Sequence, residues 1–232
     1  MISRPHKTWS VALLDLVLPP SCAGCGRYGT AICSACRASL RPPGLASDAF
    51  LASDHSVVVG DALILATAAF AHREAAQRIL RRLKYGGGRR LAGLLAELAL
   101  PALSRLLAVS GPAALVPVPL HRSRQRDRGY NQAELLAREL ARRTNLTVWP
   151  ALVRRRATQR QHGLDRTTRL RNLSQAMELS TVRPPAAAHE AMPAVLLVDD
   201  ILTTGATLEA CAVILRAAGV PAVYGFAVAR EV

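Results

Sequence analysis

The sequence predicts an α/β fold, in which a parallel sheet is flanked by helices and a small cysteine-bearing module precedes it. Two observations indicate the sheet: several unbroken apolar runs are typical of buried strands, and helical segments alternate with them. A third, two close pairs of cysteines near the N-terminus, indicates the module. The 232 residues, half of them apolar, suffice for one domain and a small appendage.

The elements follow from hydrophobic periodicity. Helices are expected at residues 9–18, 73–84, 91–107, 132–143 and 207–218. Strands are expected at residues 63–70, 114–120, 148–153, 195–198 and 222–229. In such sheets the ligand lies at the carboxyl ends of the strands, so the segments after Leu120 and Val198 are the ones to inspect.

Two units are predicted along the chain. Residues 1–44 hold the first helix and the double Cys-x₂-Cys module, and residues 57–232 hold the α/β domain. A Pro-Pro-Gly break at residues 42–44 and a Ser/Asp-rich stretch to residue 56 indicate a linker between them.

The most informative segment is an acidic pair followed by a Thr/Gly loop. Asp199 and Asp200 follow the strand at residues 195–198, and the loop enters a helix at Thr207. A helix N-terminus presents unpaired N–H groups that suit a phosphate, and Gly205 would let the backbone approach it. Carboxylates beside an anion site suit sugar hydroxyls and Mg²⁺. The alternative is an ordinary strand–helix junction in which Thr207 is only an N-cap.

This segment resembles the signature of type I phosphoribosyltransferases, which are glycosyltransferases. The resemblance implies a type I phosphoribosyltransferase-like sheet, with Asp199 and Asp200 on the ribose hydroxyls of phosphoribosyl pyrophosphate (PRPP), Mg²⁺ bound with it, and catalysis at the same pair. It implies that the 5′-phosphate is bound by Thr203, Thr204, Gly205, Ala206 and Thr207. No acceptor pocket is recognisable, so binding without transfer stays open.

The cysteine module has the pattern Cys-x₂-Cys-x₇-Cys-x₂-Cys. Its members, Cys22, Cys25, Cys33 and Cys36, could surround a structural Zn²⁺ as in zinc ribbons and knuckles. Redox use of a Cys-x-x-Cys pair is the competing interpretation, and it lacks a thioredoxin-like context. Cys211, inside the last helix, is expected to be a small core residue.

A basic segment follows the strand at residues 114–120. It is predicted to be a loop that binds pyrophosphate or a nucleic acid backbone through Arg122, Arg124, Arg126, Arg128, Tyr130 and Asn131. The chain's formal net charge of +14 also favours anionic partners. The alternative is a solvated charged loop in an arginine-rich composition.

Together with Lys84-Tyr85-x-Gly, the cysteine quartet, the basic segment and the acidic pair resemble the ComF family of competence-associated proteins. Spaced polar residues over residues 154–175 extend the resemblance, in the place where type I enzymes keep a mobile loop. The family implies a role in DNA uptake, with single-stranded DNA or a helicase as partner.

Three functions therefore compete: a phosphoribosyltransferase, a single-stranded-DNA-binding module, and an adaptor that docks a helicase. The chain has no Gly-x₄-Gly-Lys-Ser/Thr motif and so is not expected to be the helicase. Neither a secretory signal nor a run of about 18 apolar residues is recognisable, which favours the cytoplasm and no membrane span.

Overall fold

A computed structural model describes residues 20–43, 56–57, 61–86, 88–111, 113–156, 175–184 and 194–231. The helix expected at residues 9–18, most of the linker and most of the polar stretch at residues 154–175 lie outside the described residues.

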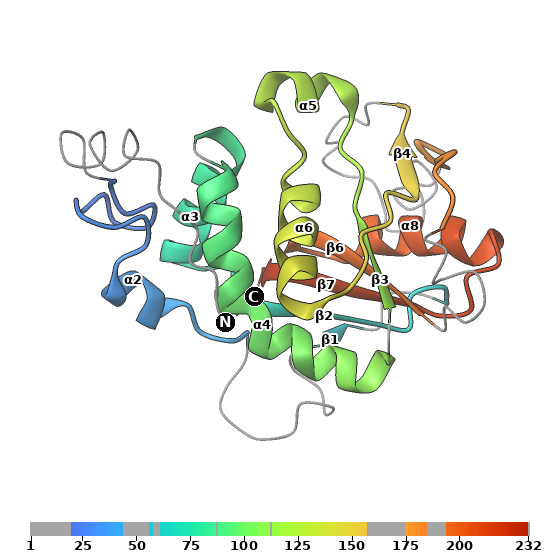
Figure 1. Cartoon of the computed structure of the whole chain (residues 1–232), viewed down its shortest axis with the longest axis horizontal. Helices are drawn as coiled ribbons and strands as arrows, with labels where there is room; N and C mark the ends of the chain where they lie inside the picture. The colour runs from blue at the N-terminus through green and yellow to red at the C-terminus, as the bar shows by residue number, and fades with distance from the viewer. Residues whose placement is uncertain are drawn as a thin grey trace, which may run out of the picture.

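The main sheet has the strand order β1-β2-β7-β6-β3. Its strands are β1 (Ser56–Val57), β2 (Leu65–Ala71), β3 (Ala113–Pro117), β6 (Ala194–Leu202) and β7 (Val223–Arg230). The last four are mutually parallel, and β1 pairs antiparallel with β2. The parallel α/β fold class is therefore confirmed, and the carboxyl ends of four strands meet at one edge (Figure 1).

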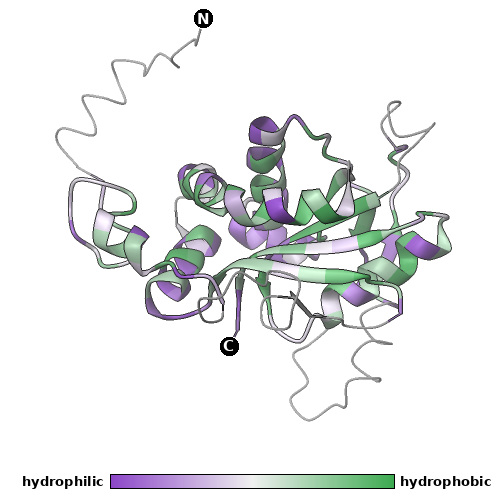
Figure 2. Cartoon of the chain, turned by 90° about the horizontal axis from the view of Figure 1, so that it is seen from below, coloured by the Kyte–Doolittle hydropathy of each residue, from purple (hydrophilic) through white to green (hydrophobic). Residues whose placement is uncertain are grey.

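Helices cover both faces of this sheet. The helices α3 (Glu74–Tyr85), α4 (Gly88–Ser110) and α6 (Gln132–Thr144) share one core cluster with Leu196 and Val198 of β6. The helix α8 (Ala206–Ala217) shares the other cluster with Val195 and Leu197. Successive residues of a strand face opposite sides, so an unbroken apolar run serves both cores. Figure 2 shows the mostly hydrophobic strands between these helices.

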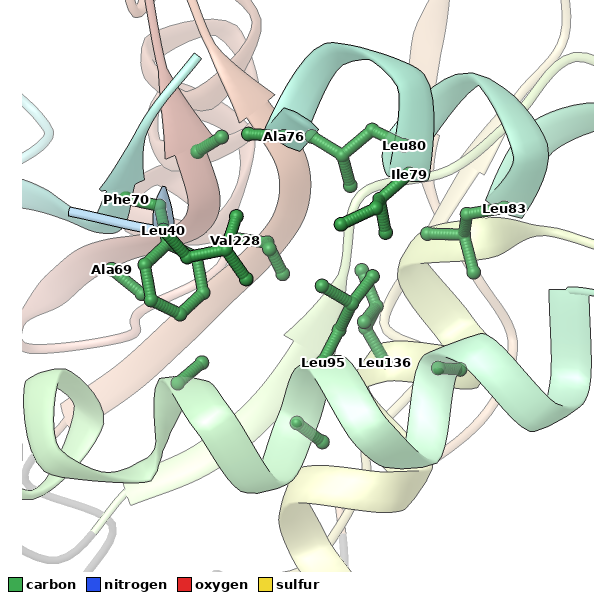
Figure 3. Packing of buried hydrophobic residues seen from close by; sticks show 14 of the residues in the cluster. Leu40, Ala69, Phe70, Ala76, Ile79, Leu80, Leu83, Leu95, Leu136 and Val228 are labelled. Carbon is green, nitrogen blue, oxygen red and sulfur yellow. The ribbon is translucent and has the colours of Figure 1, made fainter. Parts of the chain in front are cut away.

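The helix α3 is held by its apolar face. Ile79, Leu80 and Leu83 are at most 1% exposed and belong to the same cluster as Leu95 of α4 and Leu136 of α6 (Figure 3). Burying each such side chain contributes about 1.5–3 kcal/mol. The helix is therefore fixed along its length, which determines where its last residues lie.

The start of β2 is anchored by a buried carboxylate on α8. Glu209, 4% exposed, accepts the N–H groups of Ala62 and Leu63 at 3.1 and 3.0 Å. These bonds satisfy the polar atoms of a buried acid and connect the first described strand of the parallel set to the last helix.

Three local expectations need correction, and one helix is additional. The basic segment forms a short helix, α5 (Arg122–Arg128), ended by Gly129 in the left-handed region. The strand expected at residues 148–153 is reduced to β4 (Leu152–Arg154), which pairs with β5 (Met177–Leu179) outside the main sheet. The strand β6 extends through the acidic pair instead of ending before it, and Cys33 leads into a helix, α2 (Ser34–Ser39), that the cysteine spacing does not indicate.

One helix in the described part of the chain, α4, is long and apolar enough by length and composition to cross a membrane. Ten of its residues are buried, and it packs against α6, α3 and β2, as the core helix of an α/β domain does.

Candidate functional site

The acidic pair lies toward the carboxyl edge of the sheet, in the second half of β6. Asp200 is 4% exposed, and one of its oxygens, Oδ2, lies 2.5 Å from Nζ of Lys84. The other, Oδ1, accepts a hydrogen bond from Nε2 of Gln132 at 3.3 Å. A buried carboxylate requires such partners, because an unpaired charge in the interior is costly.

These partners come from two helices on one face of the sheet. Lys84 is the penultimate residue of α3, and Gln132 begins α6. Gln132 also accepts a hydrogen bond from Nη1 of Arg128 at 2.9 Å. The contacts therefore form a chain from β6 through α6 to the end of α5.

Tyr85 lies at the outer end of this chain. Its ring is covered by the guanidinium of Arg128, 5.0 Å from the ring centroid, and its hydroxyl accepts a hydrogen bond from Nη2 at 3.2 Å. This hydrogen bond is the main cause that lowers the pKa of Tyr85. The side chain remains 71% exposed. An exposed aromatic ring thus lies at the end of the series of contacts that leads to the buried Asp200.

Asp199 is the member of the pair with the raised pKa. Burial first, and the neighbouring Asp200 carboxylate second, raise its pKa well above the ordinary value. Its Oδ1 accepts the N–H of Asp200 at 2.8 Å. Burial lowers the pKa of Arg154 on β4, and Asp199 lies close enough to oppose this lowering. Two adjacent acids in which one resists ionisation are typical of functional sites.

The Thr/Gly loop connects β6 to α8. Gly205 is the N-cap, with φ 76°, a left-handed conformation that favours glycine, and the helix begins at Ala206. Thr203 and Thr204 are exposed, and Oγ1 of Thr204 accepts the N–H of Ala206 at 3.4 Å. The alternative in which Thr207 is the N-cap is wrong, because Thr207 lies inside the first turn.

The structure separates the residues of the basic segment into two groups. The side chains of Arg122, Arg124 and Arg126 are exposed on α5. Asn131 is buried: its Oδ1 accepts the N–H of Ala133 and its Nδ2 donates to the carbonyl of Val118, both at 3.0 Å. Tyr130 donates to the carbonyl of Leu83, and a Cβ at Gly88 would overlap its ring. Both residues position the helices around the acidic pair.

The four cysteines of the module form a compact group. Their Sγ atoms all lie within 4.8 Å of one another, and those of Cys25 and Cys33 are 3.7 Å apart. A tetrahedral Zn²⁺ with Zn–S bonds of about 2.3 Å requires S–S separations of about 3.8 Å. All five thiols of the chain are free. The quartet therefore can hold a metal ion, whereas Cys211 is fully buried beside Met177, as expected for a core residue.

The thiols of the quartet have unequal acidities. Burial raises the pKa of Cys22, but N–H groups directed at its sulfur, from Cys33 at 3.3 Å and from Cys25 and Gly24, lower it to about 6. Burial and the neighbouring thiols raise the pKa of Cys36 to about 12. Sulfurs that accept backbone N–H groups are suited to metal binding, because the metal ligand is the thiolate.

Sequence reasoning missed two partners of the acidic pair. In the sequence, Lys84 stands out only as part of the Lys84-Tyr85-x-Gly motif, although a cation at the end of a helix near the predicted site is a usable signal for a partner of the acids. Gln132 carried none, since a glutamine at the start of a helix is ordinary. Its role depends on the packing of α6 beside β6.

Comparison with known proteins finds relatives named for competence and for DNA utilization. No protein-family model matches the chain. Competence protein F of Haemophilus influenzae is 38% identical over 120 residues, 51% of each chain. DNA utilization protein YhgH of Escherichia coli K12 is 32% identical over 157 residues, 66% of each chain, and the protein of that name from Salmonella typhi matches to the same extent. The aligned region thus spans about half to two thirds of these relatives. The order of motifs, the parallel fold and these similarities together show that the chain belongs to the ComF family.

Proposed function

We propose that the carboxyl edge of the sheet binds PRPP or a related ribose phosphate. The observation that carries the proposal is the acidic pair itself: two adjacent carboxylates, one of them with a raised pKa, lie near the end of β6, separated by four residues from the glycine that caps the N-terminus of α8. A packed core has no use for such like charges, whereas a sugar diol beside a phosphate uses both features.

Each group has a role in this arrangement. Asp199 and Asp200 accept hydrogen bonds from the ribose 2′ and 3′ hydroxyls, and the segment from Thr203 to Thr207 holds the 5′-phosphate through the first N–H groups of α8. Lys84 already lies against Asp200 and supplies a cation toward the pyrophosphate. Mg²⁺ arriving with PRPP neutralises part of the pyrophosphate charge.

Binding is the claim that the geometry supports most directly. Transfer of the phosphoribosyl group would further need an acceptor near the sugar carbon that bears the pyrophosphate. A family site that binds PRPP without transferring it would use the same residues, so catalysis at Asp199 and Asp200 is tested separately from binding.

We also propose that the cysteine quartet holds a structural Zn²⁺ and that the protein acts in cytoplasmic DNA utilisation. The first rests on four free thiols whose Sγ atoms all lie within 4.8 Å of one another. The second rests on relatives named for competence and DNA utilization. The domain division at residues 44–57 is proposed with one qualification: Cys22, Cys36 and Leu40 share a core cluster with α3 and α4, so the two units are packed together.

A second candidate function is binding of single-stranded DNA, with or without a helicase partner. The specific observation is the exposed surface formed by Arg122, Arg124 and Arg126 beside the exposed Tyr85. Phosphates favour the arginines, and a base can stack on an exposed ring. Of the two tyrosines near the site, only Tyr85 offers its ring, because Tyr130 is packed between helices.

Replacing Asp199 tests the ribose-phosphate site. The pKa of Asp199 is higher in the folded chain than in the unfolded chain, where it is near 3.9. The stability that the protonated carboxyl contributes is therefore fully present below the unfolded-state pKa and is lost as the pH rises through the folded-state pKa. The variant Asp199→Asn should therefore be more stable than the wild type at pH 8 and equally stable below pH 4. In calorimetric titration it should bind PRPP with Mg²⁺ at least about tenfold more weakly. The exposed Asp61→Asn is the control, and unchanged affinity in Asp199→Asn would contradict the proposal.

Metal analysis tests the zinc site. The purified chain should contain about one zinc per molecule, and Cys33→Ser should lose most of it, because three thiolates and a hydroxyl bind Zn²⁺ weakly. Cys211→Ala, which removes the one thiol outside the quartet, should retain the full content. A zinc-free wild type, or equal zinc in both variants, would refute the assignment.

The DNA-binding candidate predicts salt-sensitive binding of a labelled oligothymidylate in fluorescence anisotropy. Replacing Arg122, Arg124 and Arg126 by Ala should reduce the slope of log affinity against log salt by about 2, since each lost phosphate contact removes about 0.7 for a single strand. The control is Arg138→Ala/Arg142→Ala, whose guanidinium groups pair with glutamates of α6. Equal slopes in both variants would exclude α5 as the binding surface.

A further inference from the structure

We infer that metal occupancy of the cysteine quartet controls ligand affinity at the acidic pair, and that α3 transmits the effect. The inference rests on the proposed function of that pair and adds its regulation. The two sites are connected because α3 contacts the cysteine module along one side and presents Lys84 to Asp200 at its end.

The polar contacts lie in the middle and last part of the helix. Nε of Arg78 donates to the carbonyl of Gly24, which lies between the two cysteines of the first pair. One turn later, Nη2 of Arg82 donates to Oγ of Ser21 at 2.9 Å. Arg82 precedes Lys84 by two residues, so the module contacts α3 close to the end that carries the Lys84 ammonium group.

The backbone at Gly24 is enclosed between the thiols and the helix. A Cβ there would lie 2.6 Å from Sγ of Cys36 and 3.6 Å from Cβ of Ala75 on α3. The loop that carries the first thiol pair is therefore packed directly on the helix. A change in how the thiols are arranged must change this contact, because close-packed interiors transmit strain.

Apolar packing extends the connection beyond the loop. Ile32 and Leu40 belong to the same cluster as the buried face of α3, and Figure 3 shows Leu40 in this cluster with Phe70 and Val228. The N–H of Ala71, at the end of β2, donates to the carbonyl of Arg41 at 2.8 Å. The module thus completes the core on which α3 rests.

The consequence follows from how small metal modules fold. A module of this size loses its structure when the metal leaves, because the metal supplies much of its folding free energy. Without it, α3 would lose two polar anchors and part of its apolar support, and Lys84 would no longer be held against Asp200. By linkage, a ligand bound at the acidic pair must then raise the affinity for the metal by the same factor by which the metal raises the affinity for that ligand.

The test measures zinc release from the full-length, zinc-loaded chain into excess chromophoric chelator, with and without PRPP and Mg²⁺. Saturating PRPP should slow release at least about fivefold in the wild type. The variant Arg78→Ala should lose at least half of this slowing, because it breaks the bond to Gly24. The exposed Arg81→Ala, of equal charge change on the same helix, should behave as the wild type.

A ligand-free arm separates failure of the coupling from failure of the proposed function. Asp200→Asn weakens the contact with Lys84 and should speed zinc release in the wild-type background but not in Arg78→Ala. Glu209→Gln, which weakens the distant contact of α8 with Ala62 and Leu63, should leave release unchanged. If calorimetry shows PRPP binding but release is not slowed, the coupling is wrong and the site stands. If PRPP does not bind, the proposed function fails, and equal release from Asp200→Asn and wild type would overturn the coupling as well.

Discussion

The candidate site depends on the ion pair between Lys84 and Asp200. Asp200 is almost inaccessible and Lys84 is 21% exposed, so neither charge is fully solvated. Removing one partner of a buried pair leaves an uncompensated charge, which typically costs about 3–5 kcal/mol. This pair fixes the end of α3 over the carboxyl edge of the sheet, and with Gln132 it brings three elements to one point.

The arrangement concentrates negative charge where the fold alone does not need it. Asp199 lies beside Asp200 in a buried strand, with its pKa raised by burial and by its neighbour. Natural sequences retain such local conflict mainly where binding or catalysis uses it. By contrast Glu209, an acid that is 4% exposed, accepts two backbone N–H groups and joins α8 to the residues just before β2.

The sequence predicted the parts of the fold that periodicity controls. The apolar run at residues 195–198 identified β6, and the pattern at residues 132–143 identified α6, because burial on both faces or on one stripe leaves a clear mark. The acidic pair and the cysteine quartet were visible because their chemistry depends on residues close in the chain. The basic segment was mistaken for a loop, since Arg122–Arg128 forms a helix with no buried face. Gln132 could not be predicted, because its contact with Asp200 joins residues 68 positions apart.

A double-mutant cycle on Lys84→Met and Asp200→Asn, with the free energy of unfolding measured by urea at neutral pH, shows whether this ion pair organises the site. If the pair organises the site, the two changes should be coupled by about 1 kcal/mol or more, as for residues in direct ionic contact. If the two effects on the free energy of unfolding add within about 0.3–0.5 kcal/mol, the pair does not hold α3 over the acidic edge of the sheet.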